Sequence, residues 1–86
     1  NCVLKVQTDL LLEDFFLNLS LIEKRLGRLR KIKNGPRVID IDILLFDDIK
    51  LVTKNLMIPH PRMFSRDFVM RPLAEIEPEL CASFIQ

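Results

Sequence analysis

The chain has 86 residues, 49% of them hydrophobic and 29% charged, so it is long enough for one small domain and too apolar for a disordered protein. Its longest apolar run falls well short of the roughly 20 residues that a membrane-spanning helix needs, and no signal-peptide pattern is visible. We therefore expect a globular domain with no membrane partner. A reducing compartment is expected, with Cys2 and Cys81 as free, buried thiols.

The net charge of +1 conceals an uneven distribution. Seven of the thirteen Lys and Arg residues lie between positions 24 and 37, a stretch without any acid, and acids follow it directly. The protein is therefore not basic as a whole. It carries one concentrated basic segment.

The first expected elements are a strand and a long helix. Residues 1–7 (NCVLKVQ) are mostly apolar and alternate in part, which predicts a strand. Between Leu12 and Gly27 apolar residues recur at steps of three and four, the stripe of an amphipathic helix. Thr8 or Asp9 is the predicted N-cap of this helix.

A loop and a second strand follow. Residues 28–36 lack an apolar period and end in an Asn-Gly-Pro turn signal, which predicts a loop. Residues 37–46 (RVIDIDILLF) show the clearest alternation in the chain. Three isoleucines and Leu45 share one face of the predicted strand, and Asp40 and Asp42 lie on the other.

The remaining elements are expected to be short. Residues 47–48 (Asp-Asp) indicate a turn, and residues 49–52 a short return strand. Two prolines keep residues 58–61 extended, because each disfavours a helical conformation in the residue before it. Residues 68–80 predict a short helix that begins near Pro72, whose ring suits a first helical turn.

Asp40 and Asp42 are the first candidate site. Residues two apart on a strand project from Cα atoms about 6.5–7 Å apart. Two carboxylates so placed repel each other and are costly to bury unpaired. A hard cation between them removes the problem, and carboxylates together with substrate phosphates are the usual ligands of Mg²⁺. The alternative is a solvated strand face paired with nearby lysines.

The basic segment 28–37 is the second candidate site. Its arginines Arg28, Arg30 and Arg37 flank a loop that ends where the carboxylate strand begins. Arginine matches phosphate oxygens bidentately and stays charged, so the segment could clamp a nucleoside triphosphate. A solvated charge run and a nucleic-acid patch are the alternatives. Against nucleic acid, the segment has no Phe and the chain has no Trp or Tyr on which bases would stack.

His60 is a third, weaker candidate. It lies between Pro59 and Pro61 on a rigid non-helical segment, with Arg66 close by in sequence. A lone histidine is more often structural than catalytic, and a phosphate contact is the functional alternative.

Two motifs give the chain a family resemblance. Residues 35–46 (GPRVIDIDILLF) match the pattern G-P-R-x-x-D-x-D-I-x-x-[FY]. A second pattern, P-H-x-x-x-x-x-R-x-F, is matched by Pro59, His60, Arg66 and Phe68. Upstream, the helix, Glu23 and a G-R-x-R run at residues 27–30 also fit. Over almost its whole length the chain resembles the 6-hydroxymethyl-7,8-dihydropterin pyrophosphokinases of folate biosynthesis.

The resemblance implies a ferredoxin-like α/β (α+β) sandwich with a mostly antiparallel sheet. The family's domain is longer and opens with a strand, a helix and a pterin-contacting loop. Residues 1–86 are therefore expected to form a single domain that corresponds to the C-terminal part, without the N-terminal strand-helix-strand part. Fusion to or association with other folate-pathway domains stays open, as does an inactive relic within a larger folate enzyme.

The resemblance also implies roles at the phosphates. Asp40 and Asp42 would hold two Mg²⁺ ions on the triphosphate of ATP. Arg28 and Arg37 would stabilise the charge that develops during transfer, and Arg28 and Arg30 would bind ATP from the same loop.

Further substrate contacts follow from the same resemblance. Glu23, His60 and Arg66 would bind ATP. Asn1 would hydrogen-bond the pterin, and Phe68 would stack on its ring.

Three positions depart from what is common in the family. Asn34 stands where an aromatic residue is frequent, Pro61 follows the histidine, and Met57 replaces a small polar residue near the adenine. These departures affect pterin stacking and nucleotide contacts and leave the metal and phosphate residues in place.

The implied activity is transfer of pyrophosphate from ATP to 6-hydroxymethyl-7,8-dihydropterin, with release of AMP. ATP is the co-substrate, Mg²⁺ the cofactor and the pterin the acceptor, and no nucleic acid takes part. The cytoplasm is the expected location, with an organelle as the alternative. The 86 residues alone are expected to be inactive.

Overall fold

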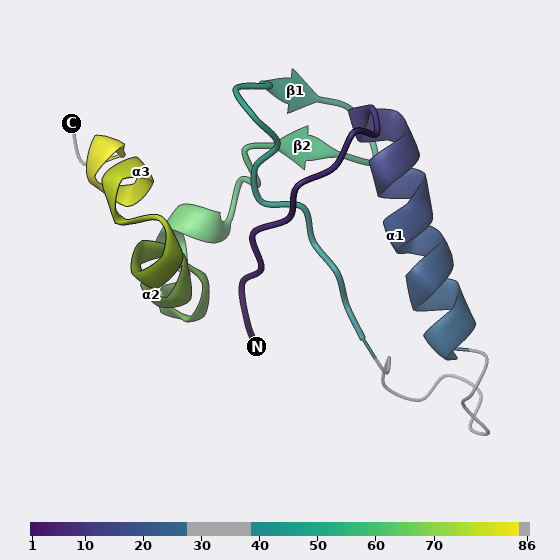
Figure 1. Ribbon diagram of the computed structural model, residues 1–86, viewed down its shortest axis with the longest axis horizontal. Coiled ribbons are helices and arrows are strands. Elements are labelled where there is room, and N and C mark those ends of the chain that lie inside the picture. Colours follow the sequence, from purple (N-terminus) through teal and green to yellow (C-terminus); the bar gives the residue numbers. More distant parts are fainter. Residues whose placement is uncertain (28–38, 85–86) are drawn as a thin grey trace.

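The computed structural model describes residues 1–27 and 39–84. Its elements, in chain order, are α1 (Leu12–Gly27), β1 (Leu51–Val52), β2 (Met57–Ile58), the 3-10 helix η1 (Met63–Ser65), α2 (Asp67–Ile76) and α3 (Pro78–Ser83). The helix α1 lies at one end, α2 and α3 lie at the other, and the β1–β2 hairpin lies between them (Figure 1). No helix in these described ranges is long and apolar enough to cross a membrane. The chain is thus mixed α and β, with a small antiparallel sheet.

The predicted amphipathic helix is confirmed as α1. Acids occupy its first turn and bases its last, which complements the helix dipole. Leu12 is buried, and Phe15, Phe16 and Leu19 pack against the same apolar cluster. The period of three and four therefore identified the side of the helix that faces the hairpin.

The predicted cap of α1 is wrong. The Thr8 hydroxyl accepts a hydrogen bond from the Leu10 N–H at 3.1 Å, and the Phe15 N–H donates to the Leu11 carbonyl at 2.9 Å. The first helical turn therefore starts from Leu11, beyond both Thr8 and Asp9. The hydroxyl closes a local turn instead, which is the other common use of threonine next to a helix.

The long strands predicted at residues 1–7 and 37–46 are wrong where the structure describes them. Neither residues 1–7 nor residues 39–46 form a strand, and within the described part the one sheet pairs β1 with β2. The alternation does hold in part, since Ile43 is buried while Asp40 and Asp42 are exposed. Extended residues become a strand only beside a neighbour that forms a ladder of backbone hydrogen bonds with them. The backbone bond that joins residues 39–46 to another described segment, from the His60 N–H to the Leu44 carbonyl, is too little for a ladder.

The predicted return strand is confirmed in part. Of residues 49–52, the second half forms β1, which pairs with β2 so that Leu51 lies opposite Ile58 and Val52 opposite Met57. The predicted turn at residues 47–48 is present. Residues 58–61 were expected only to be extended, but Ile58 belongs to β2, the second strand of the hairpin, and Pro61 lies in a turn.

The predicted start of the next helix is wrong. The helix α2 begins at Asp67, and Pro72 lies inside it. A proline there removes one backbone donor, whereas Val69 and Leu73 bury a common face of the helix. The preference of proline for a first helical turn applies instead to Pro78, which opens α3.

Two apolar clusters hold the chain together. The first joins α1, the hairpin and the segment before the turn, and its buried members are Leu12, Ile43 and Ile58. The second lies under η1 and α2, and its buried members are Met63, Val69 and Leu73. Residues 43–46 serve both clusters: Ile43 and Phe46 pack in the first, and Leu44 and Leu45 in the second. This segment therefore helps to link the two ends of the molecule.

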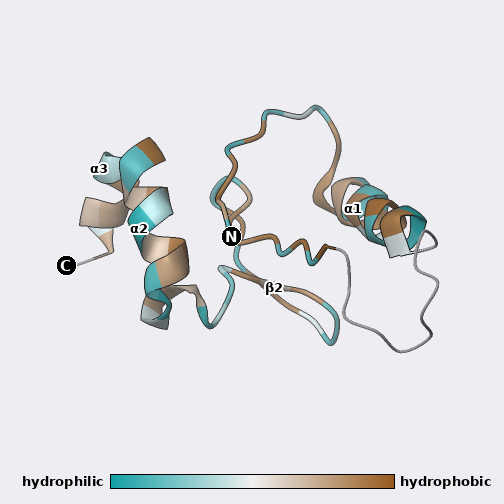
Figure 2. Ribbon diagram, turned by 90° about the horizontal axis from the view of Figure 1, so that it is seen from below, coloured by the Kyte–Doolittle hydropathy of each residue, from teal (hydrophilic) through white to brown (hydrophobic). Residues whose placement is uncertain are grey.

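Considerable apolar surface remains exposed. Leu4 is 77% exposed, Leu11 75% and Leu17 59%, on the N-terminal segment and the outer side of α1. Hydrophobic colour is visible along both of these segments in Figure 2. Cys2 is also exposed and Cys81 half-buried, both as free thiols, so the expectation of free cysteines is confirmed while that of burial is wrong for Cys2.

Candidate functional site

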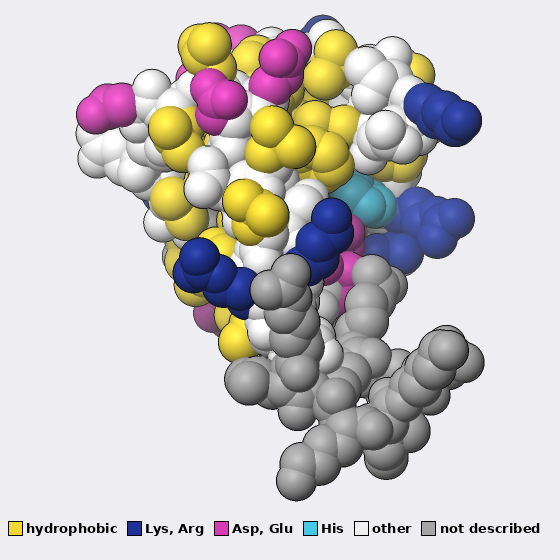
Figure 3. Space-filling view, turned by 90° about the vertical axis from the view of Figure 1, so that its right-hand side faces the viewer, with side chains coloured by type: hydrophobic (Ala, Val, Ile, Leu, Met, Phe, Trp, Pro, Cys, Tyr) yellow, Lys and Arg dark blue, Asp and Glu magenta, His cyan; other side chains and the backbone are white. Residues whose placement is uncertain are grey.

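An open hollow of about 430 Å³ lies between two parts of the chain. Residues 40–43 form one side, which we call the acidic wall because it carries Asp40 and Asp42. The lining residues between positions 54 and 66 form the other side, which we call the basic wall. Its charged and imidazole side chains are Lys54, His60, Arg62 and Arg66. In Figure 3 the histidine lies between Lys and Arg side chains, with an acidic side chain below it.

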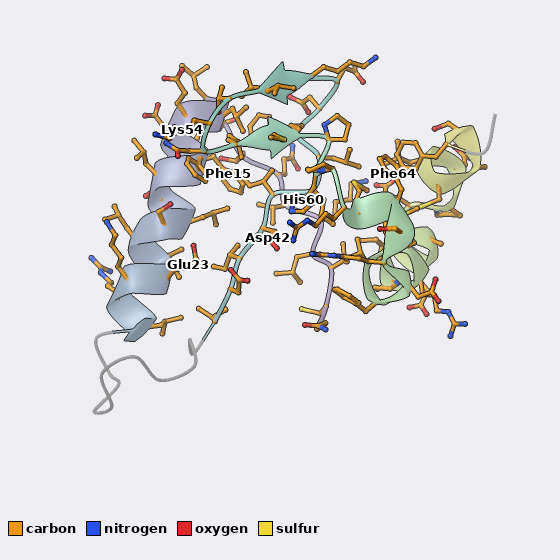
Figure 4. All side chains as sticks on the ribbon, turned by 180° about the vertical axis from the view of Figure 1, so that it is seen from behind. Phe15, Glu23, Asp42, Lys54, His60 and Phe64 are labelled. Carbon is orange, nitrogen blue, oxygen red and sulfur yellow. The ribbon has the colours of Figure 1, made fainter. Side chains whose placement is uncertain are left out.

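The acidic wall is held from α1 and from the first cluster. A Glu23 carboxylate oxygen, Oε2, accepts a hydrogen bond from the Ile41 N–H at 3.2 Å. Next along the chain, Ile43 is buried against the first cluster. These two attachments fix the backbone around the two aspartates, which stay exposed. Figure 4 shows Glu23 on α1 facing the segment that carries Asp42.

The basic wall is held mainly by local hydrogen bonds. At the hairpin tip the Thr53 hydroxyl donates to the Leu56 carbonyl at 2.9 Å and accepts from the Leu56 N–H at 3.0 Å. Further along, the His60 N–H donates to the Leu44 carbonyl at 2.9 Å. That last bond joins the basic wall to the chain directly after the acidic wall, so it sets how the two walls lie relative to each other.

The imidazole of His60 has a defined hydrogen-bonding state. Its Nδ1 accepts a hydrogen bond from the Arg62 N–H at 3.2 Å, so in this arrangement the ring proton is on Nε2. The histidine therefore offers Nε2–H as a donor. Figure 4 shows the side chains of His60 and Asp42 close to each other.

Arg66 joins the hollow to an exposed aromatic ring. It is the N-cap residue of α2, and its carbonyl accepts the N–H groups of Val69 at 3.0 Å and Met70 at 2.9 Å. Its guanidinium carbon lies 5.5 Å from the centroid of the Phe68 ring, within the range of a cation–π contact. Phe68 itself is 52% exposed. One side chain thus lines the hollow and covers a ring beside it.

The structure brings most of the predicted site residues that it describes into one region. Four of them line the hollow: Asp40, Asp42, His60 and Arg66. Two more are one contact away: Glu23 and Phe68. Asn1 is exposed and does not line the hollow. The three loop arginines lie outside the described residues: Arg28, Arg30 and Arg37.

Two cations of the hollow were not predicted. Lys54 lies at the tip of the hairpin and Arg62 directly before η1, and both line the basic wall. The signal for Arg62 was its place two residues after His60, in a segment that the prolines hold rigid. Lys54 was not identifiable, because its approach to the hollow depends on a hairpin whose second strand was not predicted.

The charges of the lining suit an anionic ligand that also brings a metal ion. Among the described residues the lining carries three cations, Lys54, Arg62 and Arg66, and two carboxylates. No group of three or more His, Cys, Asp or Glu in the described ranges could hold a metal by itself. Two carboxylates nevertheless fit Mg²⁺, which commonly takes one or two of them and completes its shell with phosphate oxygens and water.

Comparison with known proteins supplies the family. The sequence model of 7,8-dihydro-6-hydroxymethylpterin-pyrophosphokinase (HPPK) matches residues 1–78 of this chain. The chain belongs to the HPPK family. The resemblance drawn from the two sequence motifs is thereby confirmed.

Several relatives carry the HPPK match within longer proteins. A 2-amino-4-hydroxy-6-hydroxymethyldihydropteridine pyrophosphokinase of Aquifex aeolicus is 49% identical over 80 residues, which are 93% of this chain and 50% of that protein. The folic acid synthesis protein FOL1 of Dictyostelium discoideum is 47% identical over 78 residues, 91% of this chain and 12% of that protein. The bifunctional protein FolKE of Lactococcus lactis is 43% identical over 76 residues, 88% of this chain and 22% of that protein. The chain thus spans half or less of the length of these relatives.

Proposed function

We propose that this chain supplies the metal- and phosphate-binding part of an enzyme that transfers pyrophosphate from ATP to 6-hydroxymethyl-7,8-dihydropterin. The observation that carries the proposal is the hollow, which Asp40 and Asp42 line together with His60 and Arg66 although some twenty residues separate the two pairs in sequence. Carboxylates and cations gathered in one hollow are what a metal-bound polyphosphate requires.

In the proposed reaction, the hydroxymethyl oxygen of the pterin attacks the β-phosphorus of ATP. The new oxygen–phosphorus bond forms as the bond from the β-phosphorus to the α–β bridging oxygen breaks, AMP leaves, and the hydroxyl proton is lost. The chain contributes by positioning the two substrates and by offsetting charge.

Asp40 and Asp42 are the proposed ligands of Mg²⁺, two ions by the family resemblance. When bound, Mg²⁺ offsets the negative charge of the phosphate oxygens. The structural support is that both carboxylates line the hollow from a backbone fixed by the Glu23 hydrogen bond to Ile41.

On the basic wall, His60 and Arg66 are the proposed ligands of the phosphates. His60 would donate its Nε2–H to a phosphate oxygen, since its Nδ1 is already engaged by the Arg62 N–H. Arg66 would bind a second phosphate oxygen through its guanidinium fork. Both side chains start from backbone that hydrogen bonds hold in place: the His60 N–H donates to the Leu44 carbonyl, and the Arg66 N–H donates to the Met63 carbonyl.

The nucleoside half of ATP has a proposed place against the apolar part of the lining. Phe16, Leu56 and Met57 line the hollow, and their apolar side chains suit a planar base. Glu23 would also contact ATP. Its Oε2 accepts a hydrogen bond from the Ile41 N–H, and its Oε1 would accept one from a hydroxyl group of ATP.

Phe68 and Asn1 are the proposed pterin contacts. Phe68 is half exposed beside Arg66, so a ring stacked on it would lie next to the phosphates. The proposed role of Asn1, a hydrogen bond to the pterin, comes from the family resemblance alone.

Three loop arginines complete the proposed site. Arg28 and Arg37 would stabilise the charge of the transferring group, and Arg28 and Arg30 would bind ATP. These assignments come from the family pattern, since all three lie outside the described residues.

We further propose that residues 1–86 form the C-terminal part of a ferredoxin-like HPPK domain. The exposed Leu4, Leu11 and Leu17 support this, because a remaining part of such a domain would cover them. Fusion to other folate-pathway domains is supported by the names of the Lactococcus and Dictyostelium relatives, and the cytoplasm is the proposed location.

The experiment is an assay of AMP release by the intact protein with ATP, the pterin acceptor and increasing Mg²⁺. AMP that appears only when acceptor and Mg²⁺ are both present supports the proposal. Hydrolysis of ATP without acceptor, or tight binding of single-stranded DNA with no AMP release, contradicts it. The 86 residues alone are expected to be inactive in the same assay, because they cover only part of the family's domain.

A further inference from the structure

Arg62 lines the hollow at a position that the family motif leaves open. The pattern P-H-x-x-x-x-x-R-x-F specifies His60 and Arg66, and Arg62 falls on one of its unspecified positions. The structure nonetheless places Arg62 on the basic wall together with both of them. We infer that Arg62 is a further ATP-binding residue, whose guanidinium binds a phosphate oxygen next to His60. The inference rests on the proposed function.

The backbone of Arg62 is fixed from both sides. Its N–H donates to His60 Nδ1 at 3.2 Å, and its carbonyl accepts the Ser65 N–H at 3.4 Å and the Ser65 hydroxyl at 3.2 Å. The next residue, Met63, has no exposed surface and anchors the second cluster. The guanidinium therefore extends from a fixed point into solvent at the hollow, so little backbone order has to be gained on binding.

The charge of Arg62 is available for a ligand. Within the described residues Arg62 takes part in no ion pair. On the same wall, the guanidinium of Arg66 also contacts the ring of Phe68, and Lys54 lies at the hairpin tip. An arginine that lines the same hollow as the imidazole donor suits a phosphate, whose oxygens accept both N–H groups of the guanidinium fork.

The two proposed roles of Arg62 act on the same ligand. Its backbone N–H keeps His60 as an Nε2–H donor, and its side chain would add a charge-assisted donor in the hollow that both residues line. The side chain can be replaced without removing the backbone bond, so the second role can be tested separately.

The test compares Arg62→Ala with Arg71→Ala in the intact protein. Arg71 is an exposed arginine of α2 that does not line the hollow, so replacing it by alanine removes the same charge from a different place. Calorimetry with Mg²⁺ measures the affinity for ATP and for adenosine. We expect Arg62→Ala to weaken ATP binding about tenfold, the usual size of a charged hydrogen bond, and to leave adenosine binding unchanged. Arg71→Ala should change neither affinity, and Arg62→Lys should recover part of the loss.

Two results would overturn the inference. One is ATP affinity of Arg62→Ala within twofold of the unmodified protein. The other is an equal loss for adenosine, which would place the contact away from the phosphates. Thermal unfolding of each variant checks the fold, and Arg62→Gln replaces Arg62→Ala if the latter unfolds early. The proposed function fails separately, if the unmodified protein releases no AMP with the pterin acceptor.

Discussion

The two walls of the hollow are built in different ways. The acidic wall belongs to residues 39–46, which have no strand partner in the described part and are held by packing into two apolar clusters and by Glu23. The basic wall starts from a hairpin and continues through backbone hydrogen bonds between near neighbours. The carboxylates proposed to bind the metal thus depend on long-range packing, while the side chains proposed to bind phosphate depend mainly on local structure. The following predictions test that difference, from the largest expected effect to the smallest.

Ile43→Ala should destabilise the intact protein by about 2–5 kcal/mol, because it leaves a cavity beside Leu12 and Ile58 in the first cluster. Urea unfolding monitored by circular dichroism measures the change. The matched control is Ile39→Ala in the same segment, where the side chain is 38% exposed and a smaller loss is expected. Equal losses in the two variants would show that packing does not hold the acidic wall.

Asp42→Asn should lower the turnover by at least about a hundredfold with the fold intact, because it removes an anionic oxygen ligand at nearly constant volume. The same holds for Asp40→Asn. AMP release is measured against Mg²⁺ concentration, with circular dichroism alongside. Asp48→Asn serves as the control, since Asp48 is exposed and does not line the hollow. Near-normal turnover of either wall variant at low Mg²⁺ contradicts the metal assignment.

Thr53→Val should cost about 1 kcal/mol of stability, because the hydroxyl both donates to and accepts from Leu56 at the hairpin tip. Thermal unfolding measures this loss. Since the basic wall is local, the variant should raise the KM for ATP and leave the Mg²⁺ dependence of turnover unchanged. A shifted Mg²⁺ dependence would mean that the two walls are not independent.

The smallest expected effect concerns the imidazole of His60. Its Nδ1 accepts the Arg62 N–H, so ¹⁵N NMR of the neutral ring should show the proton on Nε2. Comparison with a His60→Gln variant assigns the signal. A proton found on Nδ1 would remove the hydrogen bond on which the basic wall depends.

Sequence patterns predicted a helix or turn correctly where interactions between residues near in sequence determine its conformation. The stripe of α1 and the turn at residues 47–48 were predicted from neighbouring residues and are present. Residues 39–46 show part of the predicted alternation, but strand pairing needs a partner from elsewhere in the chain. The preference of proline for a first helical turn was applied to Pro72, but it describes Pro78. Burial of Val69 and Leu73 favours a helix that continues through Pro72.

The sequence suggested a chemistry for single segments of the candidate site but not the geometry that joins them. The spacing of Asp40 and Asp42 and the position of His60 between prolines indicated phosphate chemistry for each segment separately. What joins them is the hydrogen bond from the His60 N–H to the Leu44 carbonyl, which no periodicity encodes. Lys54 was missed because the second strand of its hairpin was not predicted, whereas Arg62 could have been found from its place two residues after His60.

The packing of residues 43–46 in both apolar clusters also has a consequence for engineering. Leu44 and Leu45 pack in the second cluster while Ile43 and Phe46 pack in the first, so repacking either cluster shifts the same four residues. Those residues directly follow the aspartates. Substitutions in this segment that raise the thermal stability can therefore also move Asp40 and Asp42. Stabilised variants should be compared for the Mg²⁺ dependence of their turnover before any are combined.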